Sequence, residues 1–463
     1  MSSISEYMTA LASAAVLVST LITSQSAQAQ TFTTLHRFNG TDGAGPFAGL
    51  IQATNGDFYG TTYYGGPSND GTVFRITPEG AVATLHSFEG EDGAFPITEL
   101  IQATNGDFYG STDEGGANGY GTIFKITPTG TLTTLYSFCS ETDCTDGEYP
   151  SGLIQATNGD FYGTTSEGGK QQRDGTVFRI TPSGTLTTLH SFNYTDGRYP
   201  DGLVQATNGD FYGITRVGGA YGAGSIFKIT PGGTLTTLYS FNLTDGAYPN
   251  GGLIQSADGD FYGTTFKGGA YFWGTVFKIT PSSSFTTLYS FFEGTDGRMP
   301  FAGLIQATDR DFYGTTWGGG VNDDGTVFKI TSAGVLTTLH RFIGTQGDQP
   351  RAALIQATSG DFYGATQTGG PHGDGTVFSL SVGLAPFVET QTSSGRVGEA
   401  VKILGSDLTG ASGVTFNGTA AIFTVVSAYE ITTTVPTGAT SGTVEVTTPG
   451  GLLESNKSFE LLQ

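Results

Sequence analysis

The sequence is poor in charge, and especially in positive charge. Charged residues make up 13% of the 463 positions, and 19 lysines and arginines stand against 41 aspartates and glutamates, so the formal net charge at pH 7 is -22. An acidic surface of this kind repels phosphate backbones and anionic lipid headgroups. We therefore expect no nucleic acid among the partners of this chain and no direct insertion into a membrane.

Long apolar runs are also missing. The run Leu11–Ile22 is too short to span a bilayer, and Ala27-Gln28-Ala29 after it fits the small-residue pattern of a signal-peptidase site. The segment before the run holds Glu6 and no Lys or Arg, where a signal peptide usually has a basic region. We interpret residues 1–30 as a signal peptide and expect a secreted, periplasmic or cell-surface protein.

Cysteine is nearly absent. The only two, Cys139 and Cys144, lie five residues apart, and no neighbouring Cys or His completes a metal-binding set. In an oxidising compartment this spacing favours a local disulfide. We predict that pairing, and we expect neither a metal site nor a cofactor.

Glycine is abundant, with 73 residues, and much of it belongs to an internal repeat. Each copy contains an Asp-Phe-Tyr-Gly tetrapeptide and four short β-branched or aromatic segments bounded by Gly, Pro, Asn or Asp. A period near 50 residues is typical of propeller blades, and no helical periodicity competes with it. The tetrapeptides begin at Asp57, Asp107, Asp160, Asp210, Asp260, Asp311 and Asp361.

Turn residues order the strands of each copy. Asn55-Gly56 predicts a two-residue hairpin between the first two strands, and Thr77-Pro78-Glu79-Gly80 predicts a tight turn between the last two. Both turns lie on one face. The longer loops, including the one with Gly65-Gly66, then lie on the other, which we call the loop face.

The first copy begins with a displaced strand. A Thr-Thr-Leu-x-x-Phe segment stands at Thr33–Phe38 before any other element, and its counterpart is missing after the last Gly-Thr-Val-Phe segment. We therefore predict a seven-bladed β-propeller over residues 31–382, closed by this N-terminal strand. An open solenoid is the alternative, but it would need atypical capping repeats.

The repeat resembles the GloVer-type tandem-repeat family, which is loosely similar to kelch propellers. The shared elements are Gly-Asp-Phe-Tyr-Gly-x-Thr, a Gly-Gly pair and Gly-Thr-Val-Phe-Lys-Ile-Thr, from Thr31 to about Val382. The resemblance implies an exported bacterial protein and names no substrate. Residues 383–463 resemble an IPT/TIG domain through Gly395-x-Val397-Gly398 and Val414-x-Phe416-Asn417-Gly418-Thr419. We expect an immunoglobulin-like sandwich there.

Residues found in every copy are expected to serve the architecture, since catalysis needs a group at one place only. We expect seven glutamines on the innermost strands to form hydrogen bonds between blades and the tetrapeptide aspartates to bond turn amides. An Asp-Gly pair also recurs in six inter-blade loops, with Gln346 in the seventh; a ring of Ca²⁺ ligands is one interpretation, and a turn-forming role is the favoured one. The glutamines are Gln52, Gln102, Gln155, Gln205, Gln255, Gln306 and Gln356, and the loop aspartates are Asp42, Asp92, Asp146, Asp196, Asp245 and Asp296.

Catalytic signatures are missing. Four histidines, at positions 36, 86, 190 and 340, share one repeated outer-strand position with tyrosines, and the fifth, His372, has no identifiable partner. No Gly-x-Ser-x-Gly, His-Glu-x-x-His or phosphate-binding motif occurs. We assign no catalytic residue.

Variation among the copies indicates a binding face. Aromatic residues gather in the Gly-Gly loops, with acidic and amide groups between them, and such surfaces suit sugars or peptides. We expect an extracellular, non-catalytic binding protein for a glycan, a peptide or a surface protein; the alternative is a propeller-type polysaccharide hydrolase or lyase. The candidate ligand-binding residues are Tyr63, Tyr64, Tyr120, Tyr221, Tyr271, Phe272, Trp273 and Trp317.

Overall fold

The computed structural model describes residues 30–171, 173–292 and 294–462, and all of the regular structure in them is β except for one 3-10 turn, η1 (Thr142–Cys144). The all-β prediction is confirmed. The predicted signal peptide, except for Gln30, lies outside the described residues. No described helix is long and apolar enough to cross a membrane.

Over the described residues, the repeats form seven antiparallel sheets, one with five strands and the others with four. We number them by repeat. Sheet 1 contains β2 (Ile51–Gln52), β3 (Phe58–Thr62), β4 (Thr72–Ile76) and β5 (Val82–Ser87). Sheet 2 contains β6 (Ala94–Pro96), β7 (Ile101–Gln102), β8 (Phe108–Glu114), β9 (Thr122–Ile126) and β10 (Leu132–Ser137). Sheet 3 contains β11 (Glu148–Gln155), β12 (Phe161–Glu167), β13 (Thr176–Ile180) and β14 (Leu186–Ser191).

The next three sheets repeat this order. Sheet 4 contains β15 (Arg198–Gln205), β16 (Phe211–Val217), β17 (Ser225–Ile229) and β18 (Leu235–Ser240). Sheet 5 contains β19 (Ala247–Gln255), β20 (Phe261–Lys267), β21 (Thr275–Ile279) and β22 (Phe285–Ser290). Sheet 6 contains β23 (Ile305–Gln306), β24 (Phe312–Thr316), β25 (Thr326–Ile330) and β26 (Leu336–Arg341).

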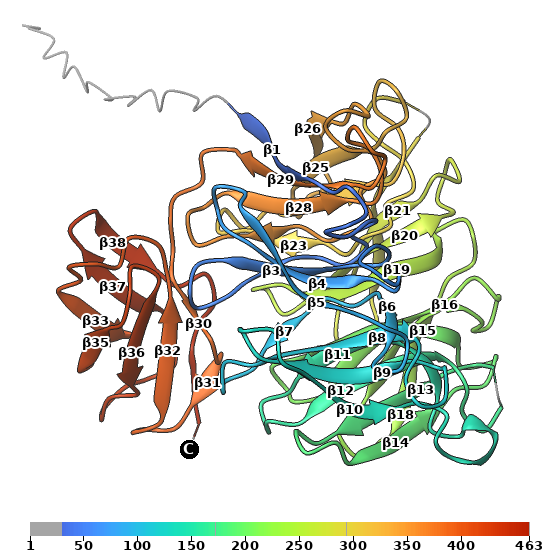
Figure 1. Ribbon diagram of the computed structural model, residues 1–463, viewed down its shortest axis with the longest axis horizontal. Helices are drawn as coiled ribbons and strands as arrows, with labels where there is room; N and C mark the ends of the chain where they lie inside the picture. The colour runs from blue at the N-terminus through green and yellow to red at the C-terminus, as the bar shows by residue number, and fades with distance from the viewer. Residues whose placement is uncertain (1–29, 172, 293, 463) are drawn as a thin grey trace, which may run out of the picture.

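Sheet 7 combines the two ends of the repeat region. Its strands are β27 (Ile355–Gln356), β28 (Phe362–Thr366), β29 (Thr376–Ser381) and the N-terminal β1 (Thr31–Arg37). β1 pairs antiparallel with β29 from Thr31 opposite Ser381 to Arg37 opposite Thr376, and Figure 1 shows the blue strand beside the orange ones. The displaced strand therefore occupies the outer edge of the last sheet, as its sequence indicated.

The hydrophobic core lies between neighbouring sheets. The tyrosine of each Phe-Tyr-Gly segment stacks on the phenylalanine of the next sheet, and Tyr363 of sheet 7 stacks on Phe58 of sheet 1 with 4.0 Å between ring centroids. Stacked aromatic pairs add to the free energy gained by burying their surface. The other six pairs, at 4.0–4.3 Å, are Tyr59–Phe108, Tyr109–Phe161, Tyr162–Phe211, Tyr212–Phe261, Tyr262–Phe312 and Tyr313–Phe362.

The repeated glutamines also join neighbouring sheets. The Oε1 atom of Gln102 accepts a hydrogen bond from the Thr54 backbone N–H of sheet 1 at 3.0 Å, and Gln52 accepts one from Thr358 of sheet 7 at 2.9 Å. Equivalent bonds from the backbone of the preceding sheet end on Gln205, Gln255, Gln306 and Gln356. These side chains satisfy backbone donors between sheets, as predicted.

The C-terminal residues form a separate β unit around a single core that includes Val401, Phe416 and Phe459. One four-stranded sheet contains β30 (Glu389–Thr390), β32 (Ala400–Leu404), β36 (Glu430–Thr434) and β35 (Phe423–Val425). The other contains β34 (Thr419–Ala420), β33 (Gly413–Phe416), β37 (Val444–Thr448) and β38 (Gly451–Glu454), and β31 (Ser394–Gly395) pairs parallel with β39 (Glu460–Leu461).

This C-terminal unit lies against the hairpin-turn ends of the repeat sheets (Figure 1). The Phe387 N–H donates to the Thr358 carbonyl at 3.0 Å, and the Gln391 side chain donates to the Ala103 carbonyl at 3.0 Å. The Tyr429 ring covers Gly56 of the first hairpin turn so closely that a Cβ there would lie 2.5 Å from it. The unit therefore contacts the face opposite the loop face.

Candidate binding face

Most of the repeated polar residues are engaged with one another, which leaves the variable residues as candidates for binding. The Asp-Gly loop aspartates bond the outer-strand histidines and tyrosines: His36 to Asp42 at 2.9 Å, for example, and Tyr136 to Asp146 at 2.8 Å. The second oxygen of Asp42 accepts the Asn39 backbone N–H at 3.1 Å. Carboxylates held in this way shape turns, which agrees with the favoured role over a ring of calcium ligands. The remaining pairs are His86–Asp92, His190–Asp196, Tyr239–Asp245 and Tyr289–Asp296.

The tetrapeptide aspartates have a use that the sequence analysis missed. In six copies, the carboxylate forms an ion pair with the Lys or Arg of the neighbouring strand, such as Asp107 with Lys125 at 3.6 Å. The turn amide bond belongs instead to the residue two positions earlier, because the Asn105 side chain accepts the Asp107 backbone N–H. The prediction thus named the right turn and the wrong side chain. The other ion pairs are Asp57–Arg75, Asp160–Arg179, Asp210–Lys228, Asp260–Lys278 and Asp311–Lys329.

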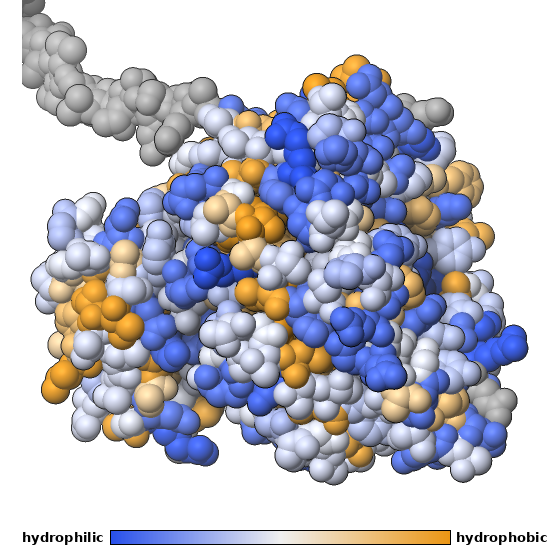
Figure 2. Space-filling view, viewed as in Figure 1, coloured by the Kyte–Doolittle hydropathy of each residue, from blue (hydrophilic) through white to orange (hydrophobic). Residues whose placement is uncertain are grey.

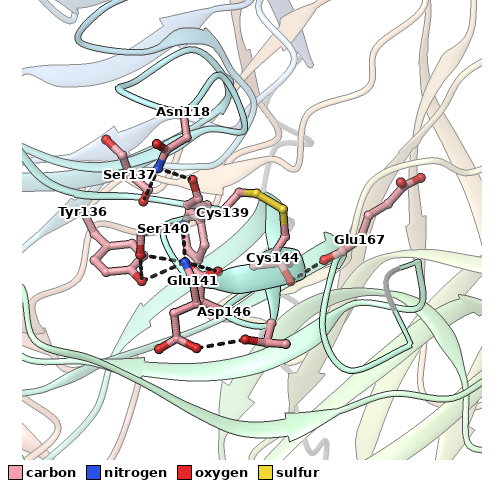
Figure 3. The surroundings of a disulfide bond; sticks show 12 residues. Asn118, Tyr136, Ser137, Cys139, Ser140, Glu141, Cys144, Asp146 and Glu167 are labelled. Carbon is pink, nitrogen blue, oxygen red and sulfur yellow. Dashed lines mark hydrogen bonds between the residues drawn. A yellow bond between two sulfur atoms is a disulfide. The ribbon is translucent and has the colours of Figure 1, made fainter.

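The predicted disulfide between Cys139 and Cys144 is present in the loop between β10 and β11 (Figure 3). Beside it, the Ser140 N–H donates to the Asp146 carboxylate at 2.9 Å, and the Gly169 N–H donates to the Cys144 carbonyl at 2.9 Å. The disulfide therefore fixes an insertion that packs against the Gly-Gly loop of sheet 3.

Exposed aromatic side chains are confined to the loop face. In the part of the chain that the structure describes, each Tyr, Phe or Trp that is exposed lies in a connection on this face or where that connection enters the next inner strand. Four of the predicted binding residues belong to this set: Tyr64, Tyr221, Tyr271 and Phe272, with Tyr221 the most open at 69%. The others are Tyr194, Tyr248 and Phe292.

The remaining predicted binding residues are half-buried. Tyr63 stacks on Phe47 at 4.5 Å and on Phe95 at 5.0 Å, so it belongs to an aromatic cluster that joins sheets 1 and 2. Tyr120 contacts Tyr149 edge-on at 5.8 Å.

The two tryptophans are linked through one residue. The Met299 N–H donates to the Trp273 carbonyl at 2.8 Å, and the Trp317 N–H donates to the Met299 carbonyl at 3.0 Å. The Arg298 guanidinium also lies over the Trp273 ring, 4.5 Å from the ring centroid. The structure thus brings both tryptophan backbones beside Met299, between sheets 5 and 6.

The sequence analysis missed a positive φ that recurs on this face in every repeat. In each repeat, the residue before the inner-strand proline has a positive φ, which is unfavourable for any residue but glycine and is further opposed by the proline. The N–H of each donates to a carbonyl of the preceding sheet's loop, as from Phe95 to Asp70 at 2.8 Å. This contact holds the side chains at the inner ends of the loops. The residues are Gly45, Phe95, Tyr149, Tyr199, Tyr248, Met299 and Gln349.

Charge is distributed unevenly among the repeats on this face. Sheets 2 and 3 supply Asp113, Glu114, Glu148 and Glu167, and burial together with the neighbouring Glu114 raises the pKa of Asp113 to about 6. The Tyr63 hydroxyl lies 3.5 Å from the Asp113 carboxylate. Asp113 is therefore mostly ionised at pH 7 and becomes neutral below about pH 6.

The connection between β6 and β7 carries Glu99, at a position that holds glycine or alanine in the other repeats. Small residues suit this position because neighbouring repeats approach closely here: a Cβ on Gly152 would lie 3.1 Å from the Gly202 Cα. Glu99 lies against Gly49, and its side chain is exposed to solvent. A single departure from the repeat thus places an exposed carboxylate between the first two repeats.

Arginines occupy another part of the loop face. The Arg351 guanidinium lies between two rings, 3.9 Å from the Phe301 centroid and 4.7 Å from the Phe47 centroid. Burial and the nearby Arg216 lower the pKa of Arg351 to about 10. Arg216 reaches Phe301 from sheet 4, with 6.0 Å between its guanidinium carbon and the ring centroid. The face is therefore acidic on sheets 2 and 3, and has arginines at sheets 4 and 7.

Solved structures with similar folds have little sequence in common with this chain. A fungal alcohol oxidase of the AA5 family, in complex with copper, matches with a TM-score of 0.53 and 13% identity, covering 94% of this chain and 99% of that one. PorZ, a surface component of the type-IX secretion system of Porphyromonas gingivalis, matches with a TM-score of 0.47 and 14% identity over 92% of this chain and 61% of its own. At 13% identity, the likeness to the alcohol oxidase extends to the fold alone.

None of the curated proteins matches the sequence. The Gloeobacter/Verrucomicrobia repeat model, by contrast, matches three overlapping segments, residues 7–219, 140–310 and 199–421. These segments together cover well over half of the chain. The chain therefore belongs to the Gloeobacter/Verrucomicrobia repeat family.

Proposed function

We propose that residues 31–382 form a seven-bladed β-propeller closed by β1, and that the C-terminal unit is an immunoglobulin-like domain of the IPT/TIG type. The seven sheets, the Tyr363–Phe58 stack and the Gln52–Thr358 bond between the last sheet and the first support the closed ring. Two four-stranded sheets around one core support the immunoglobulin-like assignment.

The propeller acts, in this proposal, as an extracellular, non-catalytic binding module whose ligand occupies the loop face. The confinement of exposed aromatic side chains to that face carries the proposal, because contiguous exposed apolar surface marks interaction sites. A glycan, a peptide or a surface protein would use the rings as flat contacts and the ring of charges for orientation. The disulfide agrees with an oxidising, extracellular location.

The C-terminal unit would serve as a spacer or docking module. Its contacts with Thr358, Ala103 and Gly56 lie on the hairpin-turn face, so it leaves the loop face accessible. Figure 2 shows hydrophobic patches on the side of this unit that faces away from the repeat sheets. Its exposed apolar residues include Val397, Ile422, Val426 and Leu452.

A polysaccharide hydrolase or lyase is the second candidate. It is favoured by one observation, the Asp113 carboxyl group, whose pKa is raised to about 6 by burial and the neighbouring Glu114. A carboxyl group with a pKa near neutrality is suited to general acid–base catalysis. Release of reducing ends or unsaturated products from a polysaccharide panel, lost in Asp113→Asn, would favour this candidate over simple binding.

Binding arrays of glycans and peptides with the mature protein test the main proposal. The ligand found there is then titrated against Trp273→Ala, Trp317→Ala and a control on the opposite face, Val335→Ala, whose side chain is 62% exposed. Loss of an aromatic anchor should weaken binding by about 2 kcal/mol or more, and the control should bind normally. Unchanged affinity in both tryptophan variants, with folding intact, would move the site away from these loops.

A further inference from the structure

Two arginines on the loop face lack acidic partners. In a chain with 19 Lys and Arg residues against 41 acidic ones, most basic side chains find a carboxylate easily. Within the described ranges, neither Arg351 nor Arg216 has a carboxylate oxygen within 4.0 Å, whereas six of the repeated strands pair their cation with an aspartate. Arg351 is partly buried, and an unpaired cation in such surroundings is costly, so its retention there points to a partner outside the chain.

The surroundings of Arg351 hold its guanidinium in place. Phe301 and Phe47 lie on its two sides, and the remaining polar contact is a long one, 3.5 Å from Nη1 to Gln367 Oε1. A planar guanidinium fixed by stacking can bind a carboxylate through two parallel N–H donors. The side chain is therefore preorganised for an anion.

Arg216 comes toward the same ring from a distant repeat. It belongs to β16 of sheet 4, is exposed, and lies 6.0 Å from the Phe301 ring that Arg351 covers at 3.9 Å. Both guanidinium groups therefore lie around one phenylalanine. Asp201 interacts electrostatically with Arg216, but the two side chains form no ion pair within 4.0 Å among the described residues. Two like charges therefore converge on Phe301 without a bonded carboxylate.

We propose that Arg351 and Arg216 form an anion subsite on the loop face that binds the carboxylate of a uronic-acid-containing glycan. This inference rests on the proposed binding function and specifies its ligand class. A uronate combines a carboxylate with a pyranose ring, and aromatic residues such as Tyr64, which is exposed, and Trp317 lie on the same face to contact such rings. An acidic peptide offers the carboxylate without the ring.

The test compares two probes with one backbone, an oligogalacturonate hexamer and its methyl-esterified form, which has no carboxylates. Isothermal titration should give at least about tenfold weaker binding for the ester. Arg351→Gln and Arg216→Gln should each weaken the acid form by about tenfold and leave the ester unaffected. Arg351→Lys keeps the charge and loses the planar guanidinium, so its affinity for the acid form should lie between that of the unaltered chain and that of Arg351→Gln.

Arg179→Gln is the matched control, since Arg179 lies at the hairpin-turn face and is paired with Asp160. It should bind both probes as the unaltered chain does. Thermal melting of ligand-free Arg216→Gln should show no loss of stability, because its removal relieves repulsion.

Equal binding of acid and ester would overturn the anion subsite while leaving the loop-face function standing. If neither probe binds, the anion subsite for uronates is also overturned. The binding array and the tryptophan variants would then decide whether the loop face binds a ligand at all. Preference for a hexaglutamate peptide over the uronate would overturn the assignment to glycans.

Discussion

The proposed closed ring makes a sharp prediction about Phe38, which lies where the N-terminal strand meets sheets 1 and 7. The side chain is 1% exposed, packs edge-on against Phe74 of sheet 1 at 5.2 Å, and its N–H donates to the Gly375 carbonyl of sheet 7 at 3.1 Å. A Phe→Ala change at a fully buried site costs about 3–5 kcal/mol of folding free energy. Phe38→Ala should therefore destabilise the repeat region by that amount, although Phe38 stands close to the chain terminus.

Phe138→Ala provides the comparison, because Phe138 takes the same place between sheets 2 and 3 in the middle of the chain. It is 0% exposed and packs edge-on against Phe178 at 5.3 Å. Guanidinium unfolding can be followed by the fluorescence of Trp273 and Trp317, the only two tryptophans, which report on the repeat region and not on the C-terminal unit. Similar losses in both variants are expected. A loss below about 1 kcal/mol for Phe38→Ala alone would mean that the end frays as in an open solenoid, and would refute the closure.

Three further outcomes are expected. Replacing both Cys139 and Cys144 by Ser should cost no more than about 2–3 kcal/mol, because the disulfide closes a short loop; two free thiols in the exported protein would contradict the pairing. Burial lowers the pKa of His340 to about 4, below its unfolded value near 6.5, so the folded protein binds fewer protons and loses stability as pH falls from 6.5 toward 4. His340→Tyr should reduce this loss by roughly 1 kcal/mol at pH 4.5, allowing for solvent screening, and identical melting curves for the two proteins from pH 7 to pH 4.5 would disprove it. Tyr429→Ala should loosen the C-terminal unit from Gly56, seen as faster amide exchange at residues 55–57 without a lower melting temperature of the repeat region; unchanged exchange would show that other contacts suffice.

The strand order could be predicted because the same turn and strand signals recur in every repeat. Turns such as Asn55-Gly56 and the β-branched segments recur at fixed offsets. The segment Thr33–Phe38 precedes the first repeat and has no counterpart after the last one, which predicted the pairing of β1 with β29. The disulfide followed from the distance between its cysteines along the chain. The sequence also predicted that Gln52 forms a hydrogen bond to a neighbouring repeat, because a glutamine present in all seven copies is expected to serve the contacts between repeats. The structure identifies Thr358 as its partner.

The site was harder to predict because it depends on contacts between distant residues. Nothing in the segment around Phe95 signals a positive φ, since the strain is held by a hydrogen bond to Asp70 of the preceding repeat. The stacking of Arg351 between Phe301 and Phe47 likewise requires knowing which residues of neighbouring repeats meet. Aligning the copies could have identified these positions as the variable ones, but not their partners.

The central claim is that the loop face of the repeat region binds the ligand. Amide hydrogen exchange with and without the array ligand tests it directly, because bound segments exchange more slowly. The account predicts protection of the loops at residues 63–70, 216–223, 266–273 and 317–324, with no change in the hairpin turns at residues 53–57. Protection confined to those turns, or to residues 383–463, would contradict it.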